Sequence, residues 1–304
     1  MRQFLVAAGQ MGPVEADTPR SEVVRRMLIL LREAKSASVQ HVVFPELSLT
    51  TYFARDFHGD RSAVARYFEK SLPSEDTREL FEFARNNRIG FVLGYAEGLS
   101  DVLRFNSAAL VNEHGVIVGN YRKVHIPGTQ EFDPKRVWQQ LEKRYFTPGD
   151  LGFPVWDVQG MKMGMAICND RRWPESLRVL GLKGVDLVSI GYCTPVLNTQ
   201  FPDKESAELR QFQSDLTMQA GAYHNSCFVV AAAKAGIEGG CSFQGGSLVV
   251  APSGEILARA NSTADELVVA QIDLDQCDFY RNGVMKRSQR RVYAYSLICD
   301  DVKA

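Results

Sequence analysis

The sequence predicts an α/β protein built in layers, with sheets that are not purely parallel. Short runs of β-branched and aromatic residues alternate with longer helical patterns along all 304 residues. Roughly ten strands and about four substantial helices are mixed from end to end, which is typical of layered α/β folds. Turn signals between neighbouring strands indicate hairpins, and hairpins join antiparallel strands.

The apolar periodicity defines the elements in order. The expected strands are Phe4–Ala8, His41–Phe44, Phe91–Gly94, Ser107–Val111, Val116–Tyr121, Val155–Val158, Lys162–Ile167, Leu187–Gly191, Phe228–Ala233, Gly246–Val250 and Val268–Ile272. The expected helices are Ser21–Lys35, Thr77–Asn87, Pro174–Leu182 and Glu205–His224. Asp17 or Thr18, ahead of Pro19, is expected to cap the first helix. Residues Asn112–Gly115 are expected to form a hairpin turn.

No repeat, low-complexity stretch or linker divides the chain, so we expect one domain over residues 1–304. A chain of this length buries roughly three quarters of its unfolded surface, which is enough for one large core. Residues 278–304 combine four aromatic side chains with several arginines. Such a segment is either an oligomerisation arm on a partner subunit or a cluster on its own subunit, and the sequence leaves both open.

Charge and apolar patterning exclude several classes of function. With 35 Lys and Arg against 36 Asp and Glu, the net charge of −1 provides no field to attract nucleic acid or an anionic membrane. The longest apolar runs are far below the roughly 20 residues of a membrane span. The first apolar run is too short for a signal peptide and is soon followed by the polar Gln10. We therefore expect a cytoplasmic protein.

The cysteines and histidines do not form a metal-binding pattern. The six cysteines lie at least 14 positions apart, which excludes C-x-x-C and zinc-type pairs. The five histidines show no H-x-x-x-H spacing. The signatures of serine hydrolases, P-loop proteins, zinc proteases and dinucleotide-binding proteins are also missing. The role of each cysteine must therefore be inferred from its own surroundings in the sequence.

Cys168 differs from the other cysteines in its surroundings. An apolar strand ends at this thiol, and the polar and cationic segment Asn169–Arg172 follows at once. Asn169 or Asp170 is suited to cap a helix, and Pro174 suits the first helical position. We expect a thiol in this strand-to-helix turn to be presented to solvent, with backbone N–H groups and two arginines stabilising its thiolate. The other five cysteines are interpreted as small core residues.

Two further strand ends carry the groups that a thiol nucleophile needs, which are a base and a donor for the oxyanion. Glu46 and Lys123 each follow shortly after an apolar strand. Taken singly, a charge at a strand end is usually solvated. Together with Cys168, these charges indicate a site of the kind that open sheets form at their strand ends. His125 is the alternative base, in a papain-like pair with the thiol.

These segments resemble those of the nitrilase (carbon–nitrogen hydrolase) superfamily, whose triad is Glu, Lys and Cys in that chain order. Within it, the chain is similar to the N-carbamoyl-D-amino acid amidohydrolases, or D-carbamoylases. The likeness runs from about Gln10 to Ala251 and continues more weakly to the end. The matching segments are Val43–Thr51, Leu141–Phe146, Pro148–Pro154, Ile167–Glu175 and Met218–Gly221.

The resemblance implies a four-layer α-β-β-α sandwich with mixed sheets. It implies Glu46 as general base, Lys123 as electrostatic donor, Cys168 as nucleophile and Glu142 as a second carboxylate that supports the triad. His125 becomes a neighbouring support. It implies a small-molecule substrate, no metal or organic cofactor, and assembly into homodimers or homotetramers.

The resemblance also implies a substrate pocket. Its pattern places Arg171 and Arg172, with Asn169 and Thr194, around the carboxylate of an N-carbamoyl amino acid, which a guanidinium can bind through two hydrogen bonds. We expect at least one of the two arginines to be structural. His125 and Gln140 are counted with the substrate-binding residues. Preference for the D-enantiomer comes from the resemblance alone.

The chain departs from the D-carbamoylase pattern at three positions. Gln140 and Gln213 stand where histidines are expected, and Cys193 stands where an asparagine is expected. Glutamine keeps donor and acceptor capacity but does not titrate. Another carbon–nitrogen hydrolase of the superfamily, such as a β-ureidopropionase-like enzyme or an amidase, is the nearest alternative function. A non-catalytic binding module that keeps the fold is a more remote one.

Overall fold

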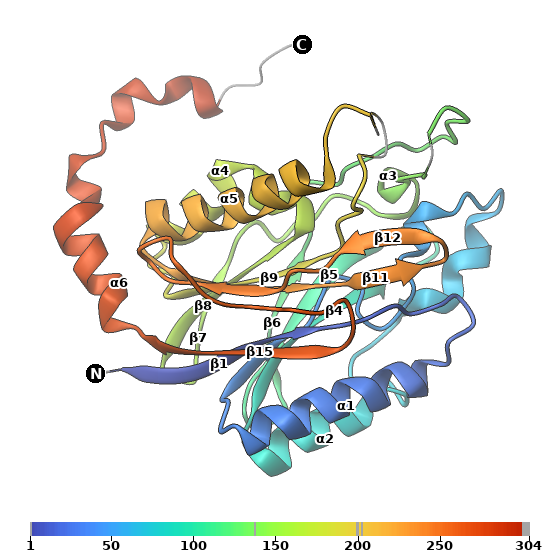
Figure 1. Cartoon of the computed structure of the whole chain (residues 1–304), viewed down its shortest axis with the longest axis horizontal. Helices are drawn as coiled ribbons and strands as arrows, with labels where there is room; N and C mark the ends of the chain where they lie inside the picture. The colour runs from blue at the N-terminus through green and yellow to red at the C-terminus, as the bar shows by residue number, and fades with distance from the viewer. Residues whose placement is uncertain (1, 137, 199–200, 202, 300–304) are drawn as a thin grey trace.

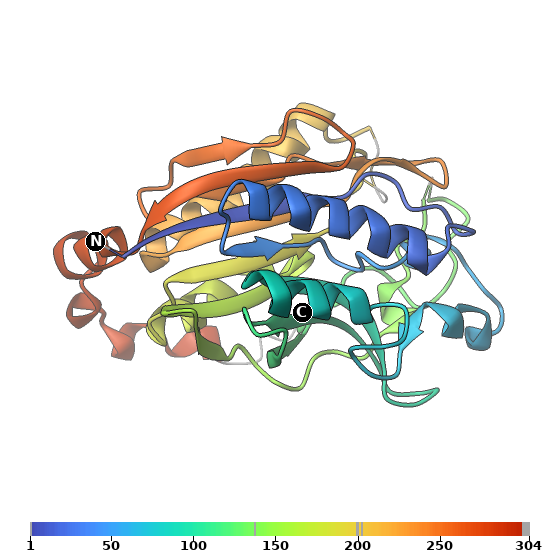
Figure 2. The same cartoon turned by 90° about the horizontal axis from the view of Figure 1, so that it is seen from below.

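Two β-sheets pack face to face at the centre of the molecule, and helices cover their outer faces (Figure 1). The computed structural model describes residues 2–136, 138–198, 201 and 203–299. The outer layers are α1 (Arg20–Ser36) and α2 (Arg78–Asn87) on one side and α4 (Pro174–Leu182) and α5 (Ala207–Asn225) on the other. The expected α-β-β-α order is confirmed. Figure 2 shows α1 and α2 lying side by side over the first sheet.

The first sheet has the strand order β15-β1-β2-β4-β5-β6, with β3 paired to β4. Its strands are β1 (Gln3–Gln10), β2 (His41–Val43), β3 (Phe68–Glu69), β4 (Gly90–Gly98), β5 (Arg104–Val111), β6 (Ile117–Arg122) and β15 (Glu266–Asp273). The β1, β2 and β4 strands run parallel, whereas β15, β5 and β6 pair antiparallel with their neighbours. The predicted hairpin between β5 and β6 is confirmed, because the Asn112 N–H donates to the Val116 carbonyl.

The second sheet has the order β14-β13-β10-β9-β8-β7. Its strands are β7 (Val155–Val158), β8 (Met161–Ile167), β9 (Leu187–Tyr192), β10 (Phe228–Ala233), β13 (Leu248–Val250) and β14 (Ile256–Arg259). The β8, β9 and β10 strands are parallel, and the outer pairs are antiparallel. A separate hairpin, β11 (Ala235–Glu238) with β12 (Cys241–Gln244), was not predicted from the sequence.

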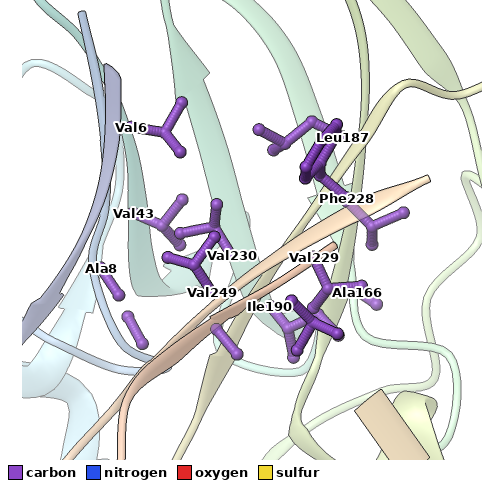
Figure 3. Close-up of a cluster of buried hydrophobic side chains, with 14 of the residues drawn as sticks. Val6, Ala8, Val43, Ala166, Leu187, Ile190, Phe228, Val229, Val230 and Val249 are labelled. Atoms are coloured by element: carbon purple, nitrogen blue, oxygen red, sulfur yellow. The ribbon is translucent and has the colours of Figure 1, made fainter. Parts of the chain in front are cut away.

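The main core fills the space between the two sheets. Small and β-branched side chains from the first sheet lie opposite those from the second, and nearly all are fully buried. Figure 3 labels Val6, Ala8 and Val43 on one side and Ile190, Val229, Val230 and Val249 on the other. Parallel strands covered on both faces must be apolar throughout, which explains the unbroken run Phe228–Ala233.

The helices match the expected ranges to within a few residues, but the predicted cap of α1 is wrong. Pro19 occupies the N-cap position without a side-chain hydrogen bond. The hydroxyl of Thr18 accepts instead from the N–H of Glu15. Pro174 opens α4, as predicted. Among the described residues, no helix is long and apolar enough to cross a lipid bilayer.

The C-terminal segment leaves β15 through α6 (Asp275–Phe279) and runs along the edge of the molecule towards α4 (Figure 1). Arginines attach it: Arg281 Nη1 lies 2.9 Å from Asp186 Oδ1, and Arg287 donates to the Gly181 carbonyl. Several of its large apolar side chains face outwards, with Tyr293 85% exposed. Contact of this segment with a partner subunit stays a prediction.

Candidate active site

Three strands from two sheets bring the predicted residues together. Glu46 follows β2, Lys123 follows β6 and Cys168 follows β8, all at the carboxyl ends of their strands. The Nζ atom of Lys123 lies 2.7 Å from Glu46 Oε1. Both side chains are fully buried, and the thiol-bearing residue is 8% exposed. The site therefore lies where the two sheets meet, and neither sheet could form it alone.

Glycines allow the Glu46 turn to cross between the sheets. A Cβ atom at Gly94 of β4 would lie 2.1 Å from the Pro45 carbonyl oxygen, and one at Gly191 of β9 would lie 2.6 Å from the Glu46 nitrogen. The backbone N–H and the hydroxyl of Ser48 both donate to the Gly94 carbonyl at 2.9 Å. Glu46 is therefore held between one strand of each sheet by a backbone approach that only glycine permits.

The backbone at Cys168 is strained, and a buried aspartate holds it in place. Cys168 has a φ of 46°, a left-handed conformation that costs a non-glycine residue roughly 1–2 kcal/mol. The carboxylate of Asp170 accepts from the Ile167 N–H at 2.9 Å and from the Tyr121 hydroxyl at 2.7 Å. These bonds fix the turn on both sides of the thiol. The sharp turn brings the thiol out of the strand and towards the space between the sheets.

Lys123 is shared by two carboxylates. Its ammonium donates to Glu46 Oε1 at 2.7 Å and to Glu142 Oε2 at 2.6 Å. Asn106 Nδ2 also donates to Glu46 Oε1 at 2.7 Å, and the Tyr52 hydroxyl donates to Glu142 Oε1 at 2.8 Å. The buried Oε2 atom of Glu46 has no hydrogen-bond partner among the described residues. That oxygen is free to accept a proton.

Burial and the neighbouring charges set the protonation states of this cluster. Burial disfavours the charged Lys123, but the charges of Glu142 and Glu46 outweigh it and raise the pKa of the ammonium, which stays protonated. Burial, together with the charge of Glu46, raises the pKa of Glu142. Burial and the charge of Glu46 also raise the pKa of the Cys168 thiol. The expectation of an exposed, stabilised thiolate is therefore wrong, because desolvation outweighs the nearby cations.

The thiol faces a small cavity of about 100 Å³. The residues that line it with Cys168 include Gln140, Asn169, Arg172, Cys193 and Thr194. The Cys168 sulfur lies 3.8 Å from the backbone oxygen of Cys193. Two of the three departures from the D-carbamoylase pattern, at positions 140 and 193, thus lie beside the thiol. The third, Gln213, instead donates to Glu205 at 3.2 Å and does not line this cavity.

The two adjacent arginines occupy different environments. Arg171 is buried and donates to the Cys168 carbonyl at 2.7 Å and to the hydroxyls of Thr194 and Ser214 at 3.0 Å. Arg172 is exposed, lines the cavity, and has no hydrogen-bond or ion-pair partner among the described residues. The contacts of Arg171 are those of a structural arginine, as expected for at least one of the two.

His125 lies on the other side of the Asn169 segment, in a larger groove of about 710 Å³. Its Nδ1 atom lies 2.8 Å from Asp170 Oδ1, and its ring stacks between Phe153 and Trp173. No contact joins His125 to Cys168 in the described part of the chain. The geometry therefore disfavours a papain-like pair and gives His125 the task of holding Asp170.

Sequence reasoning missed two residues of the cluster, Tyr52 and Asn106. Asn106 carried a signal, since an asparagine at the start of the apolar strand β5 would need a buried polar partner. The sequence gives no such signal for Tyr52, because a tyrosine among apolar residues is an ordinary core residue. Its partner Glu142 is 90 positions away.

Comparison with known proteins identifies the class to which this fold and site belong. The family model for carbon–nitrogen hydrolases matches residues 5–282. A nitrilase from Pyrococcus abyssi is 36% identical over 88% of this chain and 89% of that protein. An N-carbamoylputrescine amidase from Arabidopsis thaliana is 28% identical over 89% of this chain and 88% of that protein.

Among solved structures, a carbon–nitrogen hydrolase from Helicobacter pylori superposes with a TM-score of 0.84 at 26% identity, covering 99% of both chains. The chain belongs to the carbon–nitrogen hydrolase family. It is an enzyme of the nitrilase type that hydrolyses carbon–nitrogen bonds in amides or carbamoyl compounds.

Proposed function

We propose that this enzyme hydrolyses N-carbamoyl amino acids, with preference for the D-enantiomer, through a thioester on Cys168. The buried Glu46–Lys123 pair beside a thiol that lines a small cavity supports the reaction type. The unpartnered guanidinium of Arg172 in the same cavity carries the choice of substrate. The D-preference is supported by the resemblance to D-carbamoylases.

The first step forms the thioester. The free oxygen of Glu46 takes the proton of the Cys168 thiol as the sulfur attacks the ureido carbonyl carbon. Proton transfer and attack occur together. This suits a thiol whose pKa is raised by burial, because no free thiolate has to form beforehand. Lys123 and the backbone N–H of Asn169 stabilise the negative oxygen of the tetrahedral intermediate.

The second step releases ammonia, and the third restores the thiol. The carbon–nitrogen bond to the terminal NH₂ breaks, and Glu46 returns the proton to the departing nitrogen. A carbamoyl thioester remains on Cys168. Glu46 then takes a proton from a water molecule that attacks this thioester. The carbon–sulfur bond breaks, and Glu46 gives that proton to the departing sulfur, which restores the thiol. The released carbamate loses carbon dioxide and yields the free amino acid.

Arg172 favours a substrate that carries a carboxylate. Partial desolvation and the charges of Arg171 and Arg210 lower the pKa of its guanidinium, so a bound anion would relieve an unfavourable concentration of positive charge. The guanidinium fork fits a carboxylate through two parallel hydrogen bonds. The nearby carboxylate of Glu205 is already engaged by Arg210 at 2.8 Å.

The alternative functions differ from the proposed one in the charge of the substrate, in its shape, or in the absence of a reaction. N-carbamoylputrescine carries a cationic amine, which the arginines would repel, and a neutral amide would gain nothing from them. A β-ureidopropionase-like substrate carries a carboxylate but no side chain next to its nitrogen. A non-catalytic binding module has no use for the buried Glu46–Lys123 pair and the intact thiol.

Ammonia release from a panel of substrates tests the proposal. The panel contains N-carbamoyl-D-phenylalanine, its L-form, N-carbamoyl-β-alanine, N-carbamoylputrescine and a simple amide. We expect the D-form to be turned over fastest, Cys168→Ala to be inactive, and Arg172→Met to raise KM about 10- to 100-fold for the carboxylate substrates alone. Faster turnover of N-carbamoylputrescine, or an unchanged KM in Arg172→Met, would overturn the assignment.

A further inference from the structure

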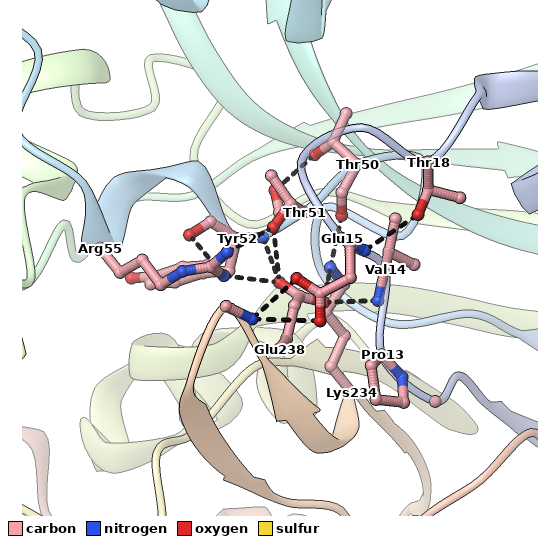
Figure 4. A network of polar contacts seen from close by, with 12 residues as sticks. Pro13, Val14, Glu15, Thr18, Thr50, Thr51, Tyr52, Arg55, Lys234 and Glu238 are labelled. Atoms are coloured by element: carbon pink, nitrogen blue, oxygen red, sulfur yellow. Dashed lines mark hydrogen bonds and ion pairs between the residues drawn. The ribbon is translucent and has the colours of Figure 1, made fainter.

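A second buried ion pair lies beside the triad. Glu238, at the end of β11, is fully buried, and its Oε2 atom lies 2.9 Å from Nζ of the equally buried Lys234 (Figure 4). Neither side chain lines the cavity of Cys168, and neither takes part in the mechanism above. Burying two charges is costly, and packed apolar residues often replace such a pair without loss of stability. The pair therefore calls for an explanation other than stability.

The Glu238 carboxylate holds the chain segment that follows Glu46. Its donors are the backbone N–H of Tyr52 (2.5 Å), the hydroxyl of Thr51 (3.1 Å), the guanidinium of Arg55 (2.9 Å) and the N–H of Val14 (3.0 Å). Lys234 donates in addition to the Thr50 carbonyl. Figure 4 shows these groups converging on Glu238. The segment Thr50–Arg55 is thus fixed to the β11 hairpin, more than 180 positions away in the chain.

Tyr52 reaches from this anchor into the active site. Its backbone is bonded to Glu238, while its hydroxyl donates to Glu142 Oε1 at 2.8 Å. Its ring packs edge-on against Phe243, with ring centres 5.9 Å apart. Burial, with the charges of Glu142 and Glu46, raises the pKa of the Tyr52 hydroxyl well above its ordinary value. The hydroxyl therefore stays a hydrogen-bond donor.

Glu142 depends on this donor. The groups that act on it are the ammonium of Lys123, the carboxylate of Glu46, the hydroxyl of Tyr52, the side-chain amide of Asn106 and the thiol of Cys168. Two carboxylates share a single ammonium, so the cluster holds an excess negative charge. Glu142 Oε2 is bonded to Lys123, whereas Tyr52 is the one partner of Oε1 among the described residues. Without the hydroxyl, Oε1 would be a buried acceptor without a donor, and binding a proton would relieve it.

We propose that Tyr52 is a positioning residue for the reaction, fixed by Glu238 and Lys234, and that its hydroxyl keeps Glu142 as a charged partner of Lys123. This inference rests on the proposed roles of Glu46, Lys123 and Cys168. If Glu142 were neutral, Lys123 would pair with Glu46 alone and would stabilise its carboxylate more strongly. Glu46 would then be a weaker base for the thiol. Because Tyr52 does not line the cavity, the loss appears in kcat and not in KM.

The pH profile of Tyr52→Phe tests this inference. The change keeps the ring against Phe243 and removes only the hydroxyl. We expect kcat to fall about 10-fold near neutral pH and KM to change less than about twofold. The acid limb of the kcat profile, set by protonation of Glu142, should move up by about one pH unit because Glu142 has lost a hydrogen-bond donor. Tyr145→Phe is the matched control, because its hydroxyl lies in the same buried cluster but bonds the Asp56 carbonyl instead. Its profile should match the wild type.

A second readout needs no substrate. The rate at which iodoacetamide alkylates Cys168, followed by peptide mass spectrometry against pH, reports the ionisation of the thiol in its cluster. We expect the alkylation profile of Tyr52→Phe, and of Glu238→Gln in its folded fraction, to move to lower pH, because a neutral Glu142 no longer raises the pKa of the Cys168 thiol. Superimposable profiles of Tyr52→Phe and the wild type would overturn the inference. Undiminished turnover by Cys168→Ala would instead overturn the proposed function and leave the alkylation result standing.

Discussion

The hydroxyl of Tyr121 donates to the carboxylate of Asp170 at 2.7 Å, and this bond ties the end of the first sheet to the turn that carries Cys168. Tyr121 lies in β6, just before Lys123, whereas Asp170 lies two residues after Cys168. Both side chains are fully buried. The bond therefore fixes the position of the thiol relative to the ammonium more directly than the packing of the sheets does.

Removing this bond should cost stability and activity together. In Tyr121→Phe, one of four hydrogen bonds to the Asp170 carboxylate is lost, and bonds to a buried charge are worth about 1.5–3 kcal/mol. We expect urea unfolding to show a loss in that range, with a lower kcat. Tyr95→Phe is the control, because its hydroxyl bonds the neutral Asn120 at 3.2 Å. Equal losses in both variants would refute the special role of Asp170.

Replacing the shared ammonium should make stability depend on pH in a new way. Lys123→Met leaves Glu46 and Glu142 buried without their cation, and breaking a buried pair in this way costs about 3–5 kcal/mol. Without the cation, the folded-state pKa of Glu142, which burial already raises, moves further above the unfolded value near 4.3. The folded state binds more protons, so its stability falls as pH rises. Urea unfolding at pH 5 and pH 8 should show a larger deficit at pH 8, and a deficit independent of pH would speak against this account.

His41 should contribute an acid-sensitive part of the stability. It lies in β2 with Nδ1 3.0 Å from Gln159 Oε1, and burial lowers its pKa to about 4. The unfolded side chain titrates near 6.5, so between these values the unfolded state binds a proton that the folded state does not. Stability is complete above pH 6.5 and falls by about 2–3 kcal/mol by pH 4.5. In His41→Leu, urea unfolding at pH 7 and pH 4.5 should show this part of the fall removed; an unchanged fall would assign it to other groups.

The C-terminal segment should decide the oligomeric state. Its arginines hold it to the subunit, while Tyr293 and Leu297 expose 85% and 76% of their surface. Exposed apolar side chains on an otherwise attached segment are typical of an interface. We expect truncation after Cys277 to lower the native mass measured by light scattering from that of a dimer or tetramer. An unchanged mass would make the segment a cluster on its own subunit.

The parts of the structure that could be predicted are those whose signal is local. Glu46, Lys123 and Cys168 each follow an apolar run closely, so their place at strand ends can be predicted from the sequence. The face-to-face packing of the two sheets then brings them together. Strand and helix ranges follow in the same way from periodicity. The β11–β12 hairpin also carries a local signal, since Gly239 and Gly240 form its two-residue turn.

The parts that could not be predicted depend on contacts distant in the chain. Arg171 and Arg172 are indistinguishable in sequence, and only the hydroxyls of Thr194 and Ser214 make one of them structural. The protonation of Cys168 was predicted wrongly because the cations beside it were visible in the sequence and its burial was not. The D-carbamoylase branch within the superfamily remains a proposal, because residue types alone do not encode chirality.

The most direct test of a sulfur nucleophile served by Glu46 and Lys123 is the mass of the covalent intermediate. The enzyme is mixed with N-carbamoyl-D-phenylalanine, quenched in acid within one turnover and mapped by peptide mass spectrometry. We predict an adduct on Cys168 with the mass of the substrate minus ammonia, absent in Glu46→Gln. Turnover without an adduct on that peptide, or an adduct on a different residue, would contradict the account.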